Sequence, residues 1–337
     1  MTKKLGVGVL GVGEMGRRHA ENLRHLVPNA QLVAVADAVE ERARKVAGEL
    51  EIEKSFGSLE AMLEHKGIDA IIIATPDAFH APAVSQVAAA GKAMLCEKPL
   101  ALNLADARAS LAAVAKHKVY FQVGFMRRYD PAYASAMKRI EAGEIGVPVV
   151  FKSLGRDKEG PPLSYYHSQI NGMLFYTNTI HDFDLARWMV QDEVTEVHAF
   201  GTAAIRPEVT QFGDVVASVV NLKFAKGAIG NIESHAQAQY GYDVRTEIVG
   251  SKAAIQVGSL HRTPATFLTT NGSVSPIADY FLSTFADAYL LEMRDFVDRI
   301  LNDREPSATG EDGFRALAIA AAAEQSQAQS RVSLVEA

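Results

Sequence analysis

The sequence has little cysteine, no concentrated positive charge and no long apolar run. Cys96 is the single cysteine among 337 residues, which excludes an intrachain disulfide and a metal site built on several thiolates. Lysine and arginine number 34 against 40 aspartates and glutamates, a net charge of −6 with no basic block. That balance argues against nucleic acid or an anionic membrane as the main partner. No stretch approaches the ~20 consecutive apolar residues that a membrane-spanning helix needs.

The remaining composition is that of an ordinary globular protein. Hydrophobic residues make up 48% and charged residues 22%, enough to build a core, and the length suggests about two domains at roughly 150 residues each. The first residues, MTKKLGVGVLGVGEMG, place lysines before apolar residues as a signal peptide does. Their apolar part is short and broken by glycine, so we interpret it as the first β-strand and expect a reducing, cytoplasmic location.

The first third of the chain alternates between strand-like and helix-like patterns. Ile71, Ile72 and Ile73 are apolar at consecutive positions, which indicates a strand covered on both faces, as in a parallel sheet. The alternation predicts βαβ units and a doubly wound, Rossmann-type α/β domain over residues 1–125. Strands are expected at residues 5–10, 31–36, 68–74, 93–96 and 119–125, with helices at about 15–27, 39–50, 79–90 and 103–117.

Beyond residue 125 the pattern changes. Val220, Leu222 and Phe224 alternate with polar residues, which is typical of a one-sided antiparallel sheet. We therefore expect a second α/β domain with a mostly antiparallel sheet over residues 126–337, whose last helices are available to pack back on the first domain. Helices are expected at about 130–142, 181–190, 284–302 and 309–328, a loop at about 155–163, and strands at 194–205, 214–224, 227–237 and 243–257.

The run GVGEMG has the glycine spacing of a dinucleotide-binding turn. It follows the first expected strand directly and opens the first helix, which is the context that this otherwise weak pattern needs. The first glycine would allow a tight turn, the second the close approach of a pyrophosphate, and the third the packing of helix on strand. The alternative is a turn with a structural role only. The candidate cofactor-binding residues here are Gly11, Gly13, Glu14, Met15 and Gly16.

Asp37 ends the second strand, 21 residues after the last of these glycines. A carboxylate there can accept hydrogen bonds from both ribose hydroxyls of NAD and would repel the 2′-phosphate of NADP. We therefore predict NAD as the cofactor. Arg42 lies close enough in sequence to keep NADP open as an alternative, and a helix cap is the alternative role for Asp37.

The run MLCEKPL places a glutamate, a lysine and a proline after an apolar strand. In a Rossmann-type domain Cys96 would end a parallel strand at the carboxyl edge of the sheet, where such sheets bind ligands. Lys98 is then expected near the nicotinamide half of the cofactor, the alternative being a solvated charged pair at a strand end. Other candidates for cofactor binding end the preceding strand or open the next helix: Thr75, Pro76 and His80.

Three motifs together resemble a known family. GVGEMG, EKP at residues 97–99 and HDFD at 181–184 are similar to the glucose–fructose oxidoreductase/inositol dehydrogenase family (Gfo/Idh/MocA), and the resemblance covers essentially the whole chain. GFMRRYD at 124–130 and YGYD at 240–243 resemble its inositol 2-dehydrogenase branch more narrowly. The resemblance implies a C-terminal domain with a large open sheet that binds substrate and forms homodimers or homotetramers. The alternate apolar residues at 215–224 offer a surface for that association.

The resemblance also implies roles for individual residues. In that family the lysine of EKP contacts the reacting hydroxyl, the adjacent glutamate lies by the nicotinamide ribose, and the histidine of HDFD takes the hydroxyl proton. These roles fall on Lys98, Glu97 and His181, in the NAD-dependent oxidation of a secondary hydroxyl of a cyclic polyol or sugar. His181 could otherwise be a capping or core histidine. The family works without metal, so no metal site is expected, although Asp182 and Asp184 follow His181.

One position departs from the family's pattern. An aspartate usually precedes the histidine by four residues, and this chain has Thr177. A threonine hydroxyl one helical turn away can orient an imidazole but cannot supply negative charge, so the identity of the polyol stays open, and Asn178 is the candidate to substitute in substrate binding. The other candidates for substrate binding, each of which could equally be an ordinary surface residue, are Arg127, Asp157, Tyr166, His167 and Tyr240.

Two other classes of function stay open. A glycosidase could use bound NAD for transient oxidation and elimination, releasing reducing sugar without net NADH. A non-catalytic NAD-sensing regulator could share the same architecture. The presence of both Lys98 and His181 argues against a sensor, which needs neither group.

Overall fold

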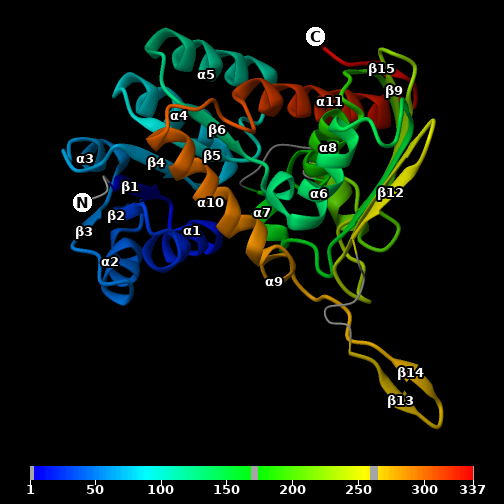
Figure 1. The fold of residues 1–337 in the computed structure, drawn as a ribbon, viewed down its shortest axis with the longest axis horizontal. Coiled ribbons are helices and arrows are strands. Elements are labelled where there is room, and N and C mark those ends of the chain that lie inside the picture. The colour runs from blue at the N-terminus through cyan, green and yellow to red at the C-terminus, as the bar shows by residue number, and fades with distance from the viewer. Residues whose placement is uncertain (1–3, 168–173, 259–264, 337) are drawn as a thin grey trace. The chain divides into compact units, whose positions relative to one another are not determined.

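The computed structural model describes residues 4–167, 174–258 and 265–336. It divides into two compact units, Met1–Tyr129 with Asp287–Phe314, and Asp130–Ala286 with Arg315–Ala337 (Figure 1). Each unit contains its own large sheet. None of the helices within the described ranges is long and apolar enough to cross a membrane.

The first unit is built on a six-stranded sheet in the order β3-β2-β1-β4-β5-β6, with every neighbouring pair parallel. Because the chain moves outward from β1 in opposite directions, the carboxyl ends of β1 and β4 meet at a topological switch point, where such sheets bind ligands. The strands are β1 (Leu5–Leu10), β2 (Ala30–Ala36), β3 (Lys54–Phe56), β4 (Ala70–Ile73), β5 (Ala93–Glu97) and β6 (Phe121–Gly124). The helices are α1 (Glu14–His25), α2 (Glu40–Glu49), α3 (Leu59–Leu63), α4 (His80–Ala89), α5 (Leu104–His117) and α10 (Ala286–Leu301), with short 3₁₀ turns η1 (Asp77–Phe79) and η2 (Met126–Tyr129).

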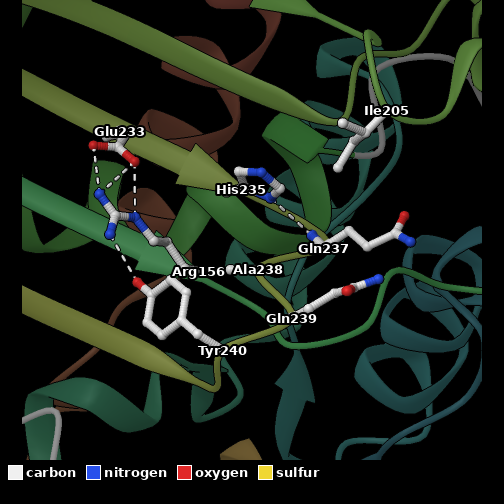
Figure 2. A pocket seen from close by; sticks show the side chains of 8 residues that line it. All are labelled: Arg156, Ile205, Glu233, His235, Gln237, Ala238, Gln239 and Tyr240. Carbon is white, nitrogen blue, oxygen red and sulfur yellow. Dashed lines mark hydrogen bonds and ion pairs between the residues drawn. The ribbon is translucent and has the colours of Figure 1, made fainter.

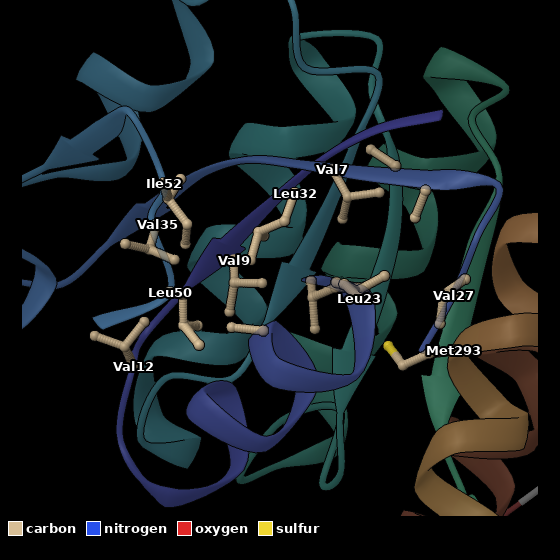
Figure 3. Packing of buried hydrophobic residues seen from close by; sticks show 14 of the residues in the cluster. Val7, Val9, Val12, Leu23, Val27, Leu32, Val35, Leu50, Ile52 and Met293 are labelled. Atoms are coloured by element: carbon tan, nitrogen blue, oxygen red, sulfur yellow. The ribbon is translucent and has the colours of Figure 1, made fainter. Parts of the chain in front are cut away.

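The core of this unit covers both faces of the sheet, as the run of isoleucines predicts. Ile71, Ile72 and Ile73 are all fully buried. Ile72 belongs to a cluster with Val9 of β1, residues of α1 and α2, and Met293 of α10 (Figure 3). The helix α10 thus returns from a distant part of the sequence to complete this layer.

The second unit is built on a seven-stranded sheet in the order β12-β11-β7-β10-β9-β8-β15. Only its β7–β10 pair is parallel, so the predicted fold class, with a mostly antiparallel second sheet, is confirmed. The strands are β7 (Pro148–Arg156), β8 (Val194–Thr202), β9 (Ala217–Phe224), β10 (Ile229–His235), β11 (Asp243–Gly250), β12 (Ala254–Val257) and β15 (Ser333–Leu334), and a separate hairpin pairs β13 (Phe267–Thr269) with β14 (Gly272–Val274). The helices are α6 (Pro131–Glu141), α7 (Leu163–Tyr166), α8 (Ile180–Val190), α9 (Phe281–Thr284) and α11 (Gly310–Gln329), with a π-helical turn η3 (Leu174–Thr179) and a 3₁₀ turn η4 (Pro207–Phe212).

The sequence prediction missed one central strand. β7 pairs with both β10 and β11, where we expected no strand and, from about residue 155, a loop. Its buried face carries Phe151, Ser153 and Gly155, so a hydroxyl and a glycine interrupt the apolar alternation that marks a strand. The expected strand at 243–257 is two strands, and the short β3 and α3 were not predicted.

We expected the alternate apolar residues at 215–224 to form a surface for association. That prediction is wrong for most of these residues. Val220, Leu222 and Phe224 are at most 3% exposed, because their face of β9 is covered within the chain. The opposite face carries Val219, which is 40% exposed, and on β10 Ile229, which is 56% exposed. Any association through this sheet therefore uses the second set of side chains.

Candidate functional site

The turn between β1 and α1 is closed at two glycines and open at the third. A Cβ at Gly11, whose φ is +82°, would lie 2.6 Å from the carbonyl oxygen of Ala74, and a Cβ at Gly16 would lie 1.8 Å from that of Gly11. A Cβ at Gly13 would meet no atom within 4 Å. Gly13 is also the residue before α1, so this open side lies at a helix N-terminus, where N–H groups and the helix dipole favour an anion. The residues present fit a dinucleotide pyrophosphate.

Asp37 lies at the carboxyl end of β2 and is 6% exposed. Its two carboxylate oxygens accept hydrogen bonds from the N–H groups of Val12, at 3.0 Å, and Val39, at 2.9 Å. Nη1 of Arg42 lies 3.2 Å from both oxygens. The carboxylate of Asp37 therefore holds the glycine turn in place, and the guanidinium of Arg42 lies beside it.

The ends of β4 and β5 are tied together by His80. Its Nδ1 lies 2.7 Å from the carbonyl oxygen of Pro99, and its Nε2 lies 2.9 Å from that of Thr75. Both ring nitrogens thus contact the backbone, so His80 shapes the two loops instead of presenting a ring nitrogen to a ligand. Lys98 follows β5 directly and is half-buried, and Pro76 is exposed at the start of η1.

Glu97, the last residue of β5, is buried against α1. Its Oε1 lies 2.7 Å from Nε2 of His19. Burial raises the pKa of Glu97, but the hydrogen bond from His19 and the positive charges of His19, Lys98 and His80 outweigh it, so the pKa is lowered. A Cβ at Gly124, on β6, would lie only 3.0 Å from Glu97 Oε2, so the glycine makes room for this side chain.

Three residues beside Glu97 were not predicted from the sequence as site residues: His19, Gly124 and Glu292, of which the last offers a carboxylate oxygen within 4.8 Å of the ligand atoms of His19 and Glu97. His19 lies three residues after Gly16 on the buried face of α1, and Glu292 lies on the buried face of α10. A histidine and a glutamate at helix positions otherwise occupied by apolar residues are the signals that could have identified them.

In the second unit His181 lies in the first turn of α8 and is 7% exposed. The π-helical turn η3 precedes it, where an ordinary helical turn was expected. Thr179, the last residue of η3, donates from Oγ1 to the carbonyl oxygen of Leu174 at 2.9 Å, and the same oxygen lies 2.8 Å from Oγ of Ser234 on β10. The turn that carries Thr177 and Asn178 is thereby attached to the sheet.

Asp157 and Asn178, both predicted from the sequence, are brought into contact. Nδ2 of Asn178 donates to Oδ2 of Asp157. The backbone of Asp157 bonds to His235 and Ala238 at 2.8 and 2.7 Å, which fixes it at the end of β10. A carboxylate is therefore held against the turn that precedes His181.

Asp182 faces the sheet. It is fully buried, and one of its oxygens accepts a hydrogen bond of 2.6 Å from Oγ of Ser153 on β7. Ser153 in turn lies 3.0 Å from Oγ1 of Thr246 on β11. This network anchors the first turn of α8 to two strands, and with it the neighbouring His181.

A polar pocket of about 590 Å³ lies beside the ends of β7 and β10 (Figure 2). On one side Arg156 forms a paired ion contact with Glu233, at 2.8 Å for each bond, and donates to the hydroxyl of Tyr240 at 2.7 Å. Burial and the charge of Arg156 lower the pKa of His235. The amide side chains of Gln237 and Gln239 extend away from the ion pair (Figure 2).

Tyr166 and His167 pack against η4. Tyr166 is 4% exposed and stacks on Phe212 at 5.4 Å between ring centroids, while His167 meets the same ring edge-on at 5.0 Å. Arg127 lies in η2 of the first unit and is 3% exposed. Residues 168–173, which follow His167, lie outside the described residues.

Comparison with protein families covers both units. The family model described as "Oxidoreductase family, NAD-binding Rossmann fold" (GFO_IDH_MocA) matches residues 5–125. The model of the same family's "C-terminal alpha/beta domain" matches residues 137–335.

Two curated relatives match over nearly the full length. The scyllo-inositol 2-dehydrogenase (NAD(+)) of Bacillus subtilis is 39% identical over 97% of this chain and 95% of its own. The myo-inositol 2-dehydrogenase of Thermotoga maritima is 36% identical over 96% of this chain and 97% of its own. Among solved structures, scyllo-inositol dehydrogenase from Lactobacillus casei, crystallised with NAD(H) and scyllo-inositol, superimposes with a TM-score of 0.93 at 28% identity, over 99% of each chain.

Proposed function

This chain belongs to the Gfo/Idh/MocA oxidoreductase family, and on that premise we propose that it is an NAD-dependent dehydrogenase that oxidises a secondary hydroxyl of an inositol or a similar cyclic polyol. The first unit binds the cofactor, mainly through residues 1–125, and residues 126–337 supply the substrate site. The observation that carries the proposal is the glycine turn, closed at Gly11 and Gly16 and open at Gly13, followed by a lysine at the end of β5.

Cofactor binding rests on three parts of the first unit. The open side of the glycine turn receives the pyrophosphate at the N-terminus of α1. Asp37 accepts the ribose hydroxyls of the adenosine half, which favours NAD over NADP. Since that half lies over β2, the nicotinamide half lies toward β4 and β5, beside Glu97 and Lys98.

We assign two chemical roles to residues of this chain, namely removal of the hydroxyl proton and stabilisation of the negative charge on the substrate oxygen. Bound NAD supplies the hydride acceptor. His181 takes the proton of the substrate hydroxyl, a general-base contribution typically worth ~10²–10⁴-fold in rate. Lys98 donates a hydrogen bond to the same oxygen and stabilises the negative charge that develops there, a contribution of roughly 3–4 kcal/mol.

The substrate class is supported by the polar residues that the second unit gathers near His181. Thr177 and Asn178 on η3, with Asp157 held against that turn, offer acceptors and donors, and a polyol ring carries hydroxyls that need both. The full-length similarity to scyllo- and myo-inositol dehydrogenases favours an inositol isomer over an open-chain sugar.

A substrate panel tests the proposal. The purified protein is incubated with NAD and each of several inositol isomers and hexoses, and the absorbance of NADH is followed. Net NADH with at least one inositol isomer is the expected result. Release of reducing sugar from glycosides without net NADH would reassign the protein as a glycosidase, and NAD binding without turnover on any compound would reassign it as a regulator.

A further inference from the structure

Three buried side chains from distant segments meet beneath the carboxyl end of β5. His19 of α1, Glu97 of β5 and Glu292 of α10 each offer one nitrogen or oxygen atom, and these atoms all lie within 4.8 Å of one another. His19 and Glu292 are fully buried and Glu97 is 6% exposed. The charge on two neighbouring carboxylates in such a place requires compensation.

The hydrogen bonds of this cluster are incomplete in a specific way. Glu97 bonds to His19 at 2.7 Å. Neither oxygen of Glu292 has a hydrogen-bond partner among the residues that the structure describes. An ionised Glu292 would strongly destabilise the fold, because a buried carboxylate without a hydrogen-bond partner has lost its hydration and gained nothing in return.

A proton accounts for these contacts better than a metal ion. Two ligands bound to one ion at ~2.0–2.1 Å lie more than about 3 Å apart, whereas His19 and Glu97 are already at hydrogen-bond distance. Burial, followed by the negative charges of Glu97 and Asp295, raises the pKa of Glu292 well above its ordinary value. Burial, followed by the charge of Glu292, likewise raises the pKa of Tyr129 of η2.

We propose that Glu292 carries a proton in the folded protein while Glu97 is ionised, so that the two neighbouring carboxyl groups together carry a single negative charge beside the nicotinamide end of the cofactor. This inference rests on the proposed function for the place of the nicotinamide. His19 fixes the orientation of Glu97 through its hydrogen bond of 2.7 Å, and a neutral Glu292 leaves the charge of Glu97 without a second negative charge beside it. The single charge favours the cationic, oxidised nicotinamide over the neutral, reduced one.

The first arm of the test measures folding, without cofactor or substrate. An acid whose pKa is raised in the folded state stabilises the fold below its unfolded pKa, and that stability is lost as pH rises through the folded pKa. Glu292→Gln lacks this dependence. Its urea midpoint relative to wild type should therefore rise steadily as pH increases above about 4.5. Asp298→Asn, an exposed acid on the same helix, is the matched control and should show no such trend.

The second arm measures binding of NAD⁺ and NADH by fluorescence titration. Glu292→Gln removes no charge, so the ratio of the two affinities should stay within about twofold of wild type at pH 7. Glu97→Gln removes the charge and should weaken NAD⁺ relative to NADH by about tenfold or more. In wild type the preference for NAD⁺ should increase at alkaline pH as Glu292 loses its proton, and Glu292→Gln should abolish that increase.

Several results would overturn the proposal. A stability difference that does not vary with pH, or a Glu292→Gln shift in affinity ratio as large as that of Glu97→Gln, would mean that Glu292 carries its own charge. One equivalent of a divalent metal in the purified wild type, absent from Glu292→Gln, would assign the cluster to a metal. If wild type binds neither NAD⁺ nor NADH, the proposed function fails, and the folding arm still decides the protonation of Glu292. Glu292→Met serves that arm if the glutamine variant does not fold.

Discussion

Asn178 donates a hydrogen bond to Asp157, and this contact fixes the π-helical turn before His181 to the carboxyl end of β7. The contact brings a carboxylate to the turn that in this chain has Thr177 in place of the family's aspartate. A negative charge near an imidazole stabilises its protonated form. Asp157 is therefore the residue we expect to supply that charge.

Changing the charge at this turn should move the acid limb of kcat/KM. Thr177→Asp adds a carboxylate and should move the limb to higher pH by roughly half to one unit, while Asp157→Asn should move it to lower pH by a similar amount. Thr177→Asp adds an acceptor for substrate hydroxyls, so it should also change the order of preference among inositol isomers. Full pH profiles on one active isomer, with the panel repeated, provide the measurement.

Thr202→Asp, which adds the same charge at an exposed position on β8, is the control for this prediction. It should leave both the limb and the preference order unchanged. Identical profiles in Thr177→Asp and wild type would show that position 177 does not face the substrate.

Cofactor choice should depend on Asp37. The double variant Asp37→Ala/Ala38→Arg removes the acceptor for the ribose hydroxyls and adds a cation that can bind a 2′-phosphate. The ratio of kcat/KM for NAD to kcat/KM for NADP should therefore fall by at least about a hundredfold. Arg42→Ala is the matched control, and its preference for NAD should be retained. A wild-type protein that already turns over faster with NADP at equal concentration would contradict our assignment of Asp37.

Asp214 should make the fold less stable as pH rises from about 4 to about 7. Burial raises its pKa to about 6 from 3.8, against hydrogen bonds from the N–H groups of Val215 and Leu174. Its contribution to stability is complete below pH 3.8 and is lost as pH rises through 6. The free energy of unfolding of Asp214→Asn should therefore exceed that of wild type by up to roughly 3 kcal/mol at pH 8, and by little at pH 4.

Urea unfolding at several pH values checks this prediction, with the exposed Glu208→Gln of the same unit as the control. A gain in Asp214→Asn that is equal at pH 4 and pH 8 would show that the folded carboxyl group titrates at its ordinary pKa.

Association is expected through the exposed face of the second sheet. Val219 and Ile229 present apolar side chains there, and family resemblance implies dimers or tetramers. Light scattering of wild type should give two or four times the protomer mass, and Val219→Asp/Ile229→Asp should reduce it to that of the monomer. Leu26→Asp, at an exposed leucine of the first unit, should leave the mass unchanged, and a monomeric wild type would reject this interface.

The nucleotide-binding half of the fold was predictable because its signals are local. The glycine turn, the buried run of isoleucines and the carboxylate after β2 each reflect a constraint within a few residues of sequence. The same holds for the placement of His181 at a helix start. Helix and strand boundaries in this half agree with the structure to within a few residues.

The parts that the sequence did not reveal depend on contacts between distant segments. β7 is a central strand whose buried Ser153 bonds to Asp182, 29 residues away in the sequence. A polar residue at a buried strand position breaks the apolar alternation, so the sequence pattern of β7 resembles that of a loop. The cluster of His19, Glu97 and Glu292 joins three segments that no spacing rule connects. The alternation of Val220 and Leu222 with polar residues shows that β9 has an apolar face. It does not show whether that face is covered within the chain or by a second subunit.

The most direct test of the account is the turnover of two single variants. Lys98→Met and His181→Ala are assayed on an inositol isomer that the wild type oxidises, with NAD affinity measured in parallel. Each variant should lose ~10²–10⁴-fold in kcat while its affinity for NAD stays within a few-fold of wild type. Turnover close to wild type in either variant would contradict the assignment of proton transfer to His181 and of charge stabilisation to Lys98.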